Sequence, residues 1–573
     1  MVVLLFGTIL VGCAGDGKTS QEATPTPATT PSGDTSSKYP DYLNLESTWP
    51  VVKEGNDVTI SFWTTQSEAN GADYEENWYL QYLVDKSNLN IEFTQIMSDQ
   101  ITEQKNLLLN TGNIPDIMYG ADFSSTELVK YGQEQGLLLR LNDYMNEELT
   151  PNMVAAFEKD PTAKTLITLP DGGIYSVPRI DSSLNEGGLS RHFFNTKWLE
   201  AIDRDIPTTL DELIEVLYLF KSEDPGAVGK ENVVPIGSAD AYWATILDYI
   251  LNAYGFLSPG NGFSPCLRNG EVVFPAGTEV YLEYLKLMKQ FFDDGIISPD
   301  YYTMDETTLT ALIANGNTGL ITEPALCFMT DGWEDWWAVK PLTSDQNPQQ
   351  QWGSYYGYIL GGFVISAETE HPEAIMRLAD WFFTKQNAVY CRTGPYMDTE
   401  DTYGLFDTGW HIENDFDLVY GDLPSKELLS GKLFLPAHNE SVGLTGNFWL
   451  SDGLKSKNIL QEWAGNEIVK KEFDLQDADQ HYRASVTENL MPYSVESLPA
   501  GFFFYNEQEA AEISDLATVL STYAEAETAK FITGVRDMSE FDRYLSELES
   551  MGLSKYVDYY VKGWQNFKSN QGK

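Results

Sequence analysis

From about residue 56 onward, the chain alternates short β-rich segments with amphipathic helical segments, and this pattern restricts its fold more than any other feature. Residues 58–63 are rich in β-branched and aromatic side chains, and residues 90–96 alternate apolar with polar side chains. Both segments are therefore expected to be strands. Residues 114–119 form a further short apolar run. Alternation of strands and helices on this scale predicts an α/β fold with mostly parallel sheets.

Helices are expected where an apolar stripe follows a capping residue. Thr209 and Glu212 have the spacing of a capping box, and a stripe of Leu, Ile and Phe residues follows them. The other expected helices are residues 124–135, residues 281–292 ended by Gly295, a helix that starts at Pro372, and a helix capped by Ser539 and ended by Gly552.

The charge of the chain excludes several classes of partner. Its 573 residues include 36 Lys and Arg against 86 Asp and Glu, which gives a formal net charge of −50. This charge repels phosphate backbones and anionic lipids, so nucleic-acid binding and electrostatic membrane docking are disfavoured. The five His residues are scattered singly, without the i, i+4 spacing of a zinc-binding helix. We therefore expect no metal centre.

The first residues have the features of a lipoprotein signal peptide. Residues 1–12 form a short apolar run, and the tetrad Leu10-Val11-Gly12-Cys13 resembles the bacterial lipobox. We expect acylation of Cys13, with residues 14–55 serving as a flexible tether rich in Thr, Pro and Ser. The predicted location is the extracellular face of the bacterial cell membrane. A cleaved signal without lipid, or a buried N-terminal strand, is the alternative.

Three further cysteines stand at positions 266, 327 and 391, without a CxxC spacing. Their spacing supports neither a zinc ribbon nor a disulfide framework. Whether any two of Cys266, Cys327 and Cys391 form a disulfide is left open. After residue 13 no window holds 18 consecutive apolar residues, so the sequence predicts no later membrane span.

Five groups of motifs, in order along the chain, carry a resemblance to a known family. They are Thr-Gly-Asn-Ile-Pro-Asp-Ile at 111–117, the segments 194–199 and 206–213, residues 292–300, His-Pro-Glu-Ala-Ile-Met-Arg-Leu at 371–378, and the segments 530–534 and 551–553. These stretches resemble the extracellular solute-binding proteins of ATP-driven (ABC) importers. The likeness is to the carbohydrate-binding group related to maltose- and alginate-binding proteins.

This resemblance implies a hinge-linked receptor with two lobes, of the type II periplasmic-binding-protein-like fold, whose chain crosses between lobes several times. By likeness, residues 56–180 and 312–365 would form the first lobe, and residues 181–311 and 366–573 the second. An oligosaccharide would bind in the cleft and close it, and the closed form would deliver it to the permease subunits in the membrane. The resemblance implies a monomer without enzymatic activity.

In the alginate-binding relatives, a loop after the capped helix supplies calcium ligands. The corresponding stretch here, 224–232, keeps only the carboxylate of Asp224, because Gly226 and Val228 replace two Asn residues and Asn232-Val233 replaces an Asp-Glu pair. Calcium needs six or more oxygen ligands. We therefore expect this loop to hold no calcium, and we expect no cofactor.

Sugar sites combine stacked aromatic rings with planar hydrogen-bonding groups, and parallel sheets hold ligands at the carboxyl ends of their strands. The candidates at expected strand ends are Trp63, Thr65, Gln66, Tyr119, Asp122, Phe123, Arg179, Asp181, Thr322 and Glu323. Further aromatic candidates are Trp243, Tyr355, Tyr358 and Trp449. For the cluster 333–337, packing against a helix is favoured over a sugar subsite. Replacing Trp63 or Arg179 by Ala is expected to weaken binding about tenfold or more without unfolding.

Two other functions stay open. A surface lipoprotein glycoside hydrolase would need two carboxyl groups about 5–9 Å apart, and no pair among the 86 acidic residues stands out. The chain could also bind a peptide or another solute that is not a sugar, or it could serve a sensor rather than an importer.

Overall fold

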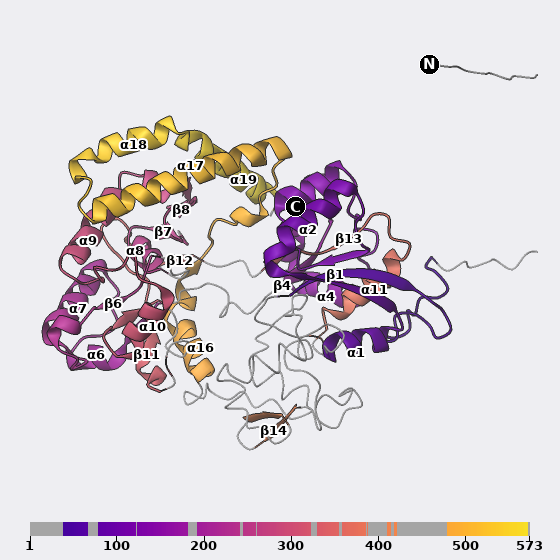
Figure 1. Cartoon of the computed structure of the whole chain (residues 1–573), viewed down its shortest axis with the longest axis horizontal. Coiled ribbons are helices and arrows are strands. Elements are labelled where there is room, and N and C mark those ends of the chain that lie inside the picture. The colour runs from indigo at the N-terminus through magenta and orange to yellow at the C-terminus, as the bar shows by residue number, and fades with distance from the viewer. Residues whose placement is uncertain are drawn as a thin grey trace, which may run out of the picture. The chain divides into compact units, whose positions relative to one another are not determined.

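The computed structural model describes residues 38–66, 78–121, 123–180, 192–240, 245–258, 260–322, 331–353, 358–384 and 478–570, with Met329, Asn387 and the short strands at 410–413 and 417–420. The chain divides into two units, Met1–Asp41 and Tyr42–Lys573. The description below concerns the second unit (Figure 1). Within the described residues, no helix has both the length and the apolar character needed to cross a membrane.

A five-stranded sheet has the order β2-β1-β3-β13-β4. β1 pairs in parallel with β2 and β3, whereas β13 is antiparallel to both β3 and β4. The sheet is therefore mixed, and the expected strands at 58–63 and 90–96 are confirmed within it, whereas only residues 117–119 of the apolar run at 114–119 form a strand. The strand bounds are β1 Thr59–Gln66, β2 Asn90–Met97, β3 Ile117–Tyr119, β4 Val177–Ile180 and β13 Tyr358–Ile365.

The Pro-Asp pair at 115–116 fixes β3 against β1. Oδ2 of Asp116 accepts hydrogen bonds from the backbone N of Ser61 at 2.9 Å and from its Oγ at 2.7 Å. The backbone N of Asp116 donates to the same Oγ at 2.9 Å. Burial alone would raise the pKa of Asp116, but hydrogen bonds from Ser61 and Thr369, together with the charge of His371, outweigh it and lower that pKa. The Pro-Asp motif therefore has a structural role, because its Asp116 holds the start of β3 against β1.

Helices cover both faces of this sheet. On one face, α2 (Ile101–Thr111) and the π-helical segment η3 (Leu128–Glu134) contribute to the core around Trp63 and Met118. A capping box of Ser124 and Glu127 starts the helix α3 (Ser125–Glu127), which continues into η3, so the helix expected at 124–135 is confirmed. The remaining helices near this sheet are α1 Trp78–Ser87, α4 Pro151–Lys159, α5 Pro161–Ile167 and α11 Pro372–Trp381.

Helix α11 belongs with the first sheet, which corrects the expected lobe assignment of residues after 365. Asp380 of α11 accepts hydrogen bonds from Asn152 Nδ2 and from the backbone N of Met153, each at 2.8 Å. Nη1 of Arg377 donates to the carbonyl of Leu149 at 3.0 Å. These buried polar contacts tie α11 to α4, so the start of the helix at Pro372 is confirmed and its assignment to the second lobe is wrong.

A four-stranded sheet has the order β11-β5-β10-β6. β10 is parallel to β6, but β5 is antiparallel to both β10 and β11. Residues 312–365 were expected in the first lobe, yet β10 and β11 pair here, so that boundary is wrong; the expectation of mostly parallel sheets also fails. The bounds are β5 Phe193–Asn195, β6 Ile236–Gly237, β10 Leu320–Ile321 and β11 Trp336–Ala338.

The helices around the second sheet follow the predicted caps. The capping box of Thr209 and Glu212 starts α7, and α9 ends just before Gly295, which has a φ of +66°. Both predictions are confirmed. The helices of this core before residue 320 are α6 Thr196–Ala201, α7 Leu210–Glu223, α8 Leu247–Asn252, α9 Tyr281–Asp293 and α10 Glu306–Ala314.

The C-terminal helices α17, α18 and α19 contact one another and complete this second core (Figure 1). Asp537, rather than the expected Ser539, caps the turn before α18, because its Oδ1 accepts hydrogen bonds from the N and the Oγ of Ser539. The bounds are α16 Ala478–Asn489, α17 Glu507–Ile532, α18 Phe541–Ser550 and α19 Leu553–Asn570.

The remaining strands lie in three small sheets. They are β7 Phe256–Leu257, β8 Cys266–Arg268 and β9 Glu271–Val273 in one, β12 Trp352–Gly353 with β16 Ser494–Val495 in another, and β14 Trp410–Glu413 with β15 Asp417–Tyr420 in the third. Short 3₁₀ helices are η2 Ser98–Gln100, η4 Lys230–Asn232, η5 Pro275–Gly277, η7 Trp333–Asp335, η10 Met491–Tyr493, η11 Ala500–Phe502 and η12 Met538–Glu540.

Two consecutive residues link the cores of the two sheets. Phe503 is 2% exposed and belongs to the core of the four-stranded sheet, whereas Phe504 packs against the core around Trp63. Oγ of Ser125 donates to the carbonyl of Phe503 at 2.8 Å. The segment before α17 therefore contacts the cores of both sheets.

Candidate ligand-binding site

Four candidate positions lie at one edge of the five-stranded sheet. β1 and β3 run in parallel, so Gln66 and Tyr119 end at the same edge. β13 is antiparallel to β3 and β4, which places its first residues at that edge, where Tyr358 pairs with Ile180 and Ile359 with Arg179. Residues separated by almost 300 positions in sequence are thus brought together by strand register.

The structure describes only part of this set at the level of side chains. For Thr65, Gln66, Arg179 and Tyr358 it describes the backbone, which places them in β1, β4 and β13. Several predicted residues lie outside the described part of the chain: Asp122, Asp181, Trp243, Glu323, Tyr355 and Trp449, together with Cys13, Cys327 and Cys391. Their proposed roles stay predictions.

Trp63 and Tyr119 are buried side chains. Trp63 is 2% exposed and packs in the core with Met118 and Phe123. Tyr119 is 4% exposed, and its ring centroid lies 6.1 Å from that of Phe62. Contact of either residue with a ligand remains a prediction. Removing a buried Trp costs about 3–5 kcal/mol, so a Trp63→Ala variant is now expected to lose stability as well.

The second sheet has a comparable edge. β6 and β10 are parallel and end at Gly237 and Ile321, so the residues that follow them, Ser238 and Thr322, lie at the same edge. Phe193 pairs with Ile321 in antiparallel register, which brings His192 to this edge as well. In the sequence, the strand-end candidate Glu323 follows β10, and Trp243, chosen only as an aromatic residue, follows β6.

Asp240 is a candidate that the sequence analysis missed. It stands three residues after β6, and its side chain is half-buried. Burial, together with the nearby charge of Glu525, raises the pKa of Asp240. Among the described residues, no hydrogen bond to its carboxylate is formed. Its position shortly after a strand would have been the signal, but β6 has only two residues and is not recognisable in the sequence.

Two buried hydroxyl groups near these edges have no hydrogen-bond partner within the described ranges. Oγ1 of Thr64 in β1 and Oγ1 of Thr322 after β10 are both fully buried without a hydrogen bond. Buried polar atoms in folded proteins are usually paired, so such exceptions are candidates for a bound water or ligand. Near Thr322, His192 is buried and stacks on Tyr249 with centroids 5.6 Å apart. Burial lowers the pKa of His192 to about 3, so its ring is neutral.

The aromatic cluster at 333–337 packs against a helix, as favoured from the sequence. Trp336 is 3% exposed within β11. The rings of Trp333 and Trp337 meet the ring of His481 on α16 edge-on, with centroids 5.4 and 4.8 Å apart. Nε2 of His481 also lies 2.9 Å from the carbonyl oxygen of Trp336. These contacts fix α16 to the edge strand of the four-stranded sheet.

The residues of the loop after α7 do not fit a calcium ion. Oδ1 and Oδ2 of Asp224 already accept hydrogen bonds from the backbone N of Val228 at 3.0 Å and of Gly229 at 2.8 Å. A Cβ on Gly226 would lie 2.4 Å from Cζ2 of Trp198, so that ring occupies the space of a liganding side chain. Asn232 points its amide nitrogen, a donor, at the carbonyl of Val228. The loop is closed by its own hydrogen bonds.

Comparisons with known proteins identify the relatives of this chain. Residues 67–389 match the family model described as bacterial extracellular solute-binding protein. The fructooligosaccharide ABC transporter substrate-binding protein FusA of Streptococcus pneumoniae serotype 4 is 24% identical over 544 residues, which cover 93% of this chain and 94% of that protein.

Two solved structures share the fold. The S. pneumoniae FusA complex with kestose has a TM-score of 0.67 at 21% identity, over 89% of this chain and 100% of that chain. An extracellular solute-binding protein from Bifidobacterium longum subsp. infantis has a TM-score of 0.72 at 19% identity, over 90% and 99%. The family model matches more than half of the residues, and this chain therefore belongs to the bacterial extracellular solute-binding protein family.

Proposed function

We propose that this chain is the substrate-binding component of an ABC importer, and that it captures an oligosaccharide and delivers it to the permease. The observation that carries the proposal is the strand register that brings Gln66, Tyr119, Arg179 and Tyr358 to one sheet edge. Open α/β sheets bind ligands outside the carboxyl ends of their strands. The relation to FusA along almost the whole chain supports a sugar as the ligand.

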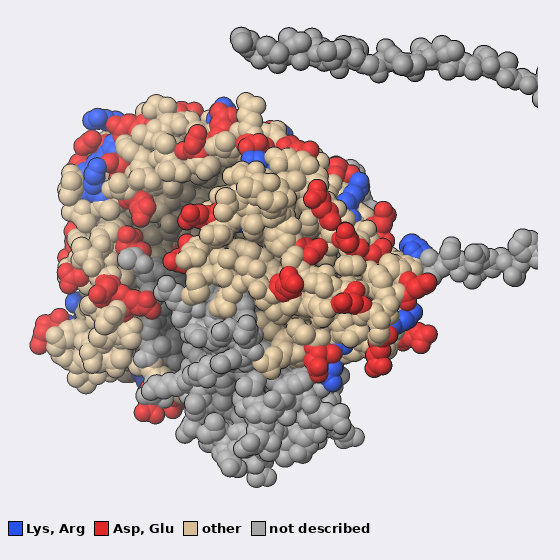
Figure 2. All heavy atoms as spheres, turned by 45° about the vertical axis from the view of Figure 1, so that its right-hand side comes forward, with Lys and Arg blue, Asp and Glu red and all other residues tan. Residues whose placement is uncertain are grey.

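The charge of the chain favours a neutral sugar over a uronate. On the face shown in Figure 2, Asp and Glu clearly outnumber Lys and Arg, in line with the net charge of −50. The candidate residues include the acidic Asp122, Asp181, Asp240 and Glu323 but, as a basic residue, Arg179 alone. Carboxylates accept hydrogen bonds from hydroxyl groups but repel other carboxylates. Fructooligosaccharides such as kestose are suitable first probes.

A thermal-shift assay followed by calorimetric titration tests this proposal. Kestose and nystose at millimolar concentration should raise the melting temperature, whereas oligogalacturonides should not, because stabilisation grows as RT ln(1 + [L]/Kd). If neutral sugars leave both the melting temperature and the heat signal unchanged while another solute stabilises the chain, the sugar assignment is wrong.

Arg179 allows a sharper test of the site. Its backbone pairs with Ile359 at the carboxyl edge of the first sheet. The Arg179→Ala variant should bind the stabilising sugar about tenfold more weakly, or worse, which corresponds to about 1.4 kcal/mol. Arg140, exposed in the same half of the chain, provides the matched Arg140→Ala control and should bind as the wild type does. Equal affinities of the two variants would remove Arg179 from the site.

We further propose that the bound sugar is released unchanged. The family consists of binding proteins, and a receptor that hands its ligand to a permease has no use for cleavage. Incubation with kestose followed by chromatography should return intact kestose. Release of fructose or sucrose that scales with protein concentration would instead favour the glycoside hydrolase alternative.

The proposed anchor is Cys13. The tetrad Leu10-Val11-Gly12-Cys13 supports it, and two acyl chains suffice for stable membrane attachment. In a bacterial host, labelled palmitate should be incorporated into the chain and should be lost in a Cys13→Ser variant, which should appear in the medium. Incorporation of label that persists in Cys13→Ser would exclude this residue as the lipid site.

A further inference from the structure

We propose that Gly361 in β13 is a positioning residue of the ligand site, and that the lack of a side chain there is required for binding; this inference rests on the proposed function. Gly361 has a φ of +73° and lies next to the turn that follows β3. Gly361 has no side chain that could contact a ligand. Its role is to let three strand ends meet.

The close approach at Gly361 leaves no room for a Cβ atom. A Cβ built on this residue would lie 2.0 Å from the carbonyl oxygen of Phe123, 2.7 Å from its Cβ and 2.8 Å from its carbonyl carbon. Contacts this short do not occur between real atoms, and the partner is backbone rather than the end of a flexible side chain. Any substitution must therefore move the turn at Phe123 or the strand itself.

Hydrogen bonds clamp this turn across a bulge in β13. The backbone N of Phe123 donates to the carbonyl of Gly361 at 3.1 Å, and the N of Gly120 donates to the carbonyl of Gly362 at 2.8 Å. The pairing of β13 with β4 shifts register between Ile359 and Phe363, which is the signature of a bulge at this point. The turn that leaves the carboxyl end of β3 is thus held at both Gly120 and Phe123.

Gly361 also connects to β4. Its backbone N donates to Oγ of Ser176, which is 1% exposed and directly precedes that strand, at 3.3 Å. Beyond the bulge, Tyr358 and Ile359 pair with Ile180 and Arg179. One glycine therefore sets the relative positions of the strand ends that carry Tyr119, Arg179 and Tyr358. Bulges next to binding sites commonly direct side chains in this way.

The test compares Gly361→Ala with Gly112→Ala. Gly112 has the same φ of +73° at the end of α2, but a Cβ there would meet no atom within 4 Å. Both variants place Ala at the same positive φ, so Gly112→Ala controls for a positive φ without a close contact, and the affinity for kestose reports on the site. Gly361→Ala should bind kestose at least about tenfold more weakly, while Gly112→Ala should bind as the wild type does.

Hydrogen–deuterium exchange adds a measurement that needs no ligand. In Gly361→Ala, peptides that contain residues 117–123 and 358–363 should exchange faster than in the wild type, and in Gly112→Ala they should not. Unchanged affinity in folded Gly361→Ala, or unchanged exchange in these peptides, would overturn the positioning role. If the wild type binds no sugar, the proposed function fails and the role in binding falls with it, whereas exchange still reports whether the turn depends on Gly361.

A milder variant covers the case in which Gly361→Ala does not fold. Ser176→Ala removes the hydrogen bond to the N of Gly361 and leaves the turn contact in place. It should lower the affinity for kestose about threefold to tenfold, with faster exchange in residues 358–363. Ser222→Ala, which loses only a local hydrogen bond on α7, is the control and should change neither reading. Equal affinities of the two serine variants would contradict the proposal.

Discussion

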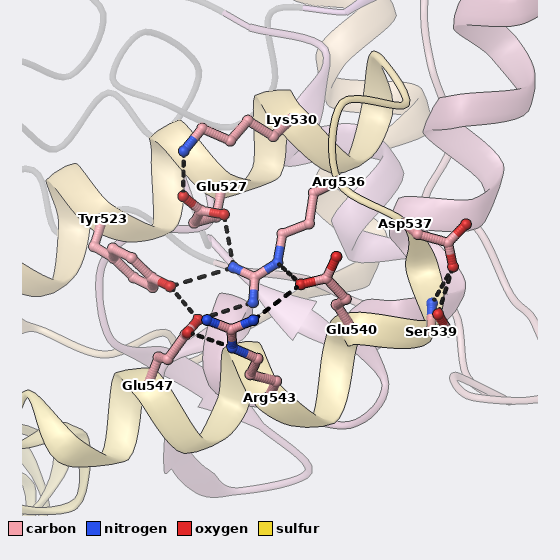
Figure 3. Close-up of polar contacts among 9 residues, drawn as sticks. All are labelled: Tyr523, Glu527, Lys530, Arg536, Asp537, Ser539, Glu540, Arg543 and Glu547. Carbon is pink, nitrogen blue, oxygen red and sulfur yellow. Dashed lines mark hydrogen bonds and ion pairs between the residues drawn. The ribbon is translucent and has the colours of Figure 1, made fainter.

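Nη2 of Arg536 lies 2.8 Å from Oε2 of Glu547, and this ion pair joins the turn after α17 to α18 (Figure 3). Nη1 of the same guanidinium lies 2.6 Å from Oε2 of Glu527 on α17. The side chains of Arg536 and Glu527 are each 9% exposed. Figure 3 shows these groups converging between the two helices, with Lys530 also paired to Glu527. The C-terminal helices are therefore joined by buried charge as well as by apolar packing.

Removing the cation should destabilise the chain. An Arg536→Met variant keeps the apolar stem but leaves the Glu527 carboxylate buried with one partner fewer, and the expected loss of unfolding free energy is about 2–3 kcal/mol. Urea unfolding followed by circular dichroism measures it. Arg204→Met, which breaks an exposed ion pair with Glu215, should change stability little. Similar urea concentrations at the unfolding midpoint for the two variants would show that the Arg536 network does not stabilise the folded chain.

The same network should make stability depend on acid pH. Hydrogen bonds from Tyr523 and Arg536 lower the pKa of Glu547 from 4.5 to about 2. A carboxyl group whose pKa is lowered by folding stabilises the folded state above its unfolded pKa, and this contribution is lost as the pH falls from about 5 toward 2. Glu547→Gln should therefore be less stable than the wild type at pH 7, with the gap narrowing at pH 3. A gap that stays constant between these pH values would contradict this assignment.

Local chemistry allowed the helices to be predicted. A capping box such as that of Thr209 and Glu212, or a Pro at the first helical position such as Pro372, acts on residues close to it in the chain. Such signals can therefore be recognised in the sequence itself. The lobe boundaries were wrong because they depend on pairing at a distance. β10 has only two residues, Leu320 and Ile321, and nothing in so short a segment tells whether it pairs with β5 or with β1.

The candidate site was predicted only in part, because it too depends on strand pairing between distant segments. The rule that ligands bind at carboxyl strand ends selected Tyr119 and Arg179, whereas Tyr358 was selected only as an aromatic residue before a strand; the register of β3, β4 and β13 places all three at one edge. It could not foresee that Trp63 would be buried. Alternation along β1 assigns Trp63 to one face, but helices cover both faces of this sheet, so either face hides an aromatic ring. Asp240 was missed because β6 is too short to recognise.

The loop after α7 should stabilise the chain without calcium. Millimolar calcium and a chelator should leave the melting temperature unchanged, because the Asp224 carboxylate is already held by the backbone N of Val228 and Gly229. Asp224→Ala should lose about 2 kcal/mol, since both bonds to a charged acceptor disappear. Asp224→Asn keeps one acceptor and tolerates the left-handed backbone, with a φ of +51°, so it should lose less. A melting temperature that falls on chelation would contradict this account.

Gly563 should be intolerant of a substitution that usually stabilises helices. Replacing Gly by Ala inside an exposed helix gains about 1 kcal/mol. In α19, however, a Cβ at position 563 would lie 2.4 Å from Cδ2 of Phe503, a ring that is itself only 2% exposed. Overpacking of this kind costs about 1–3 kcal/mol, so Gly563→Ala should destabilise the chain.

Two further variants separate crowding from helix propensity. Gly501→Ala, at a nearby position where a Cβ would meet no atom within 4 Å, should leave the melting temperature close to that of the wild type. The double variant Phe503→Leu with Gly563→Ala should lose less unfolding free energy than the two single variants lose together, because the smaller side chain makes room for the added methyl group. Additive losses would mean that the cost arises elsewhere in α19. Because Phe503 precedes the residue that packs on the other core, Phe504, crowding at Gly563 should also alter the join between the two halves.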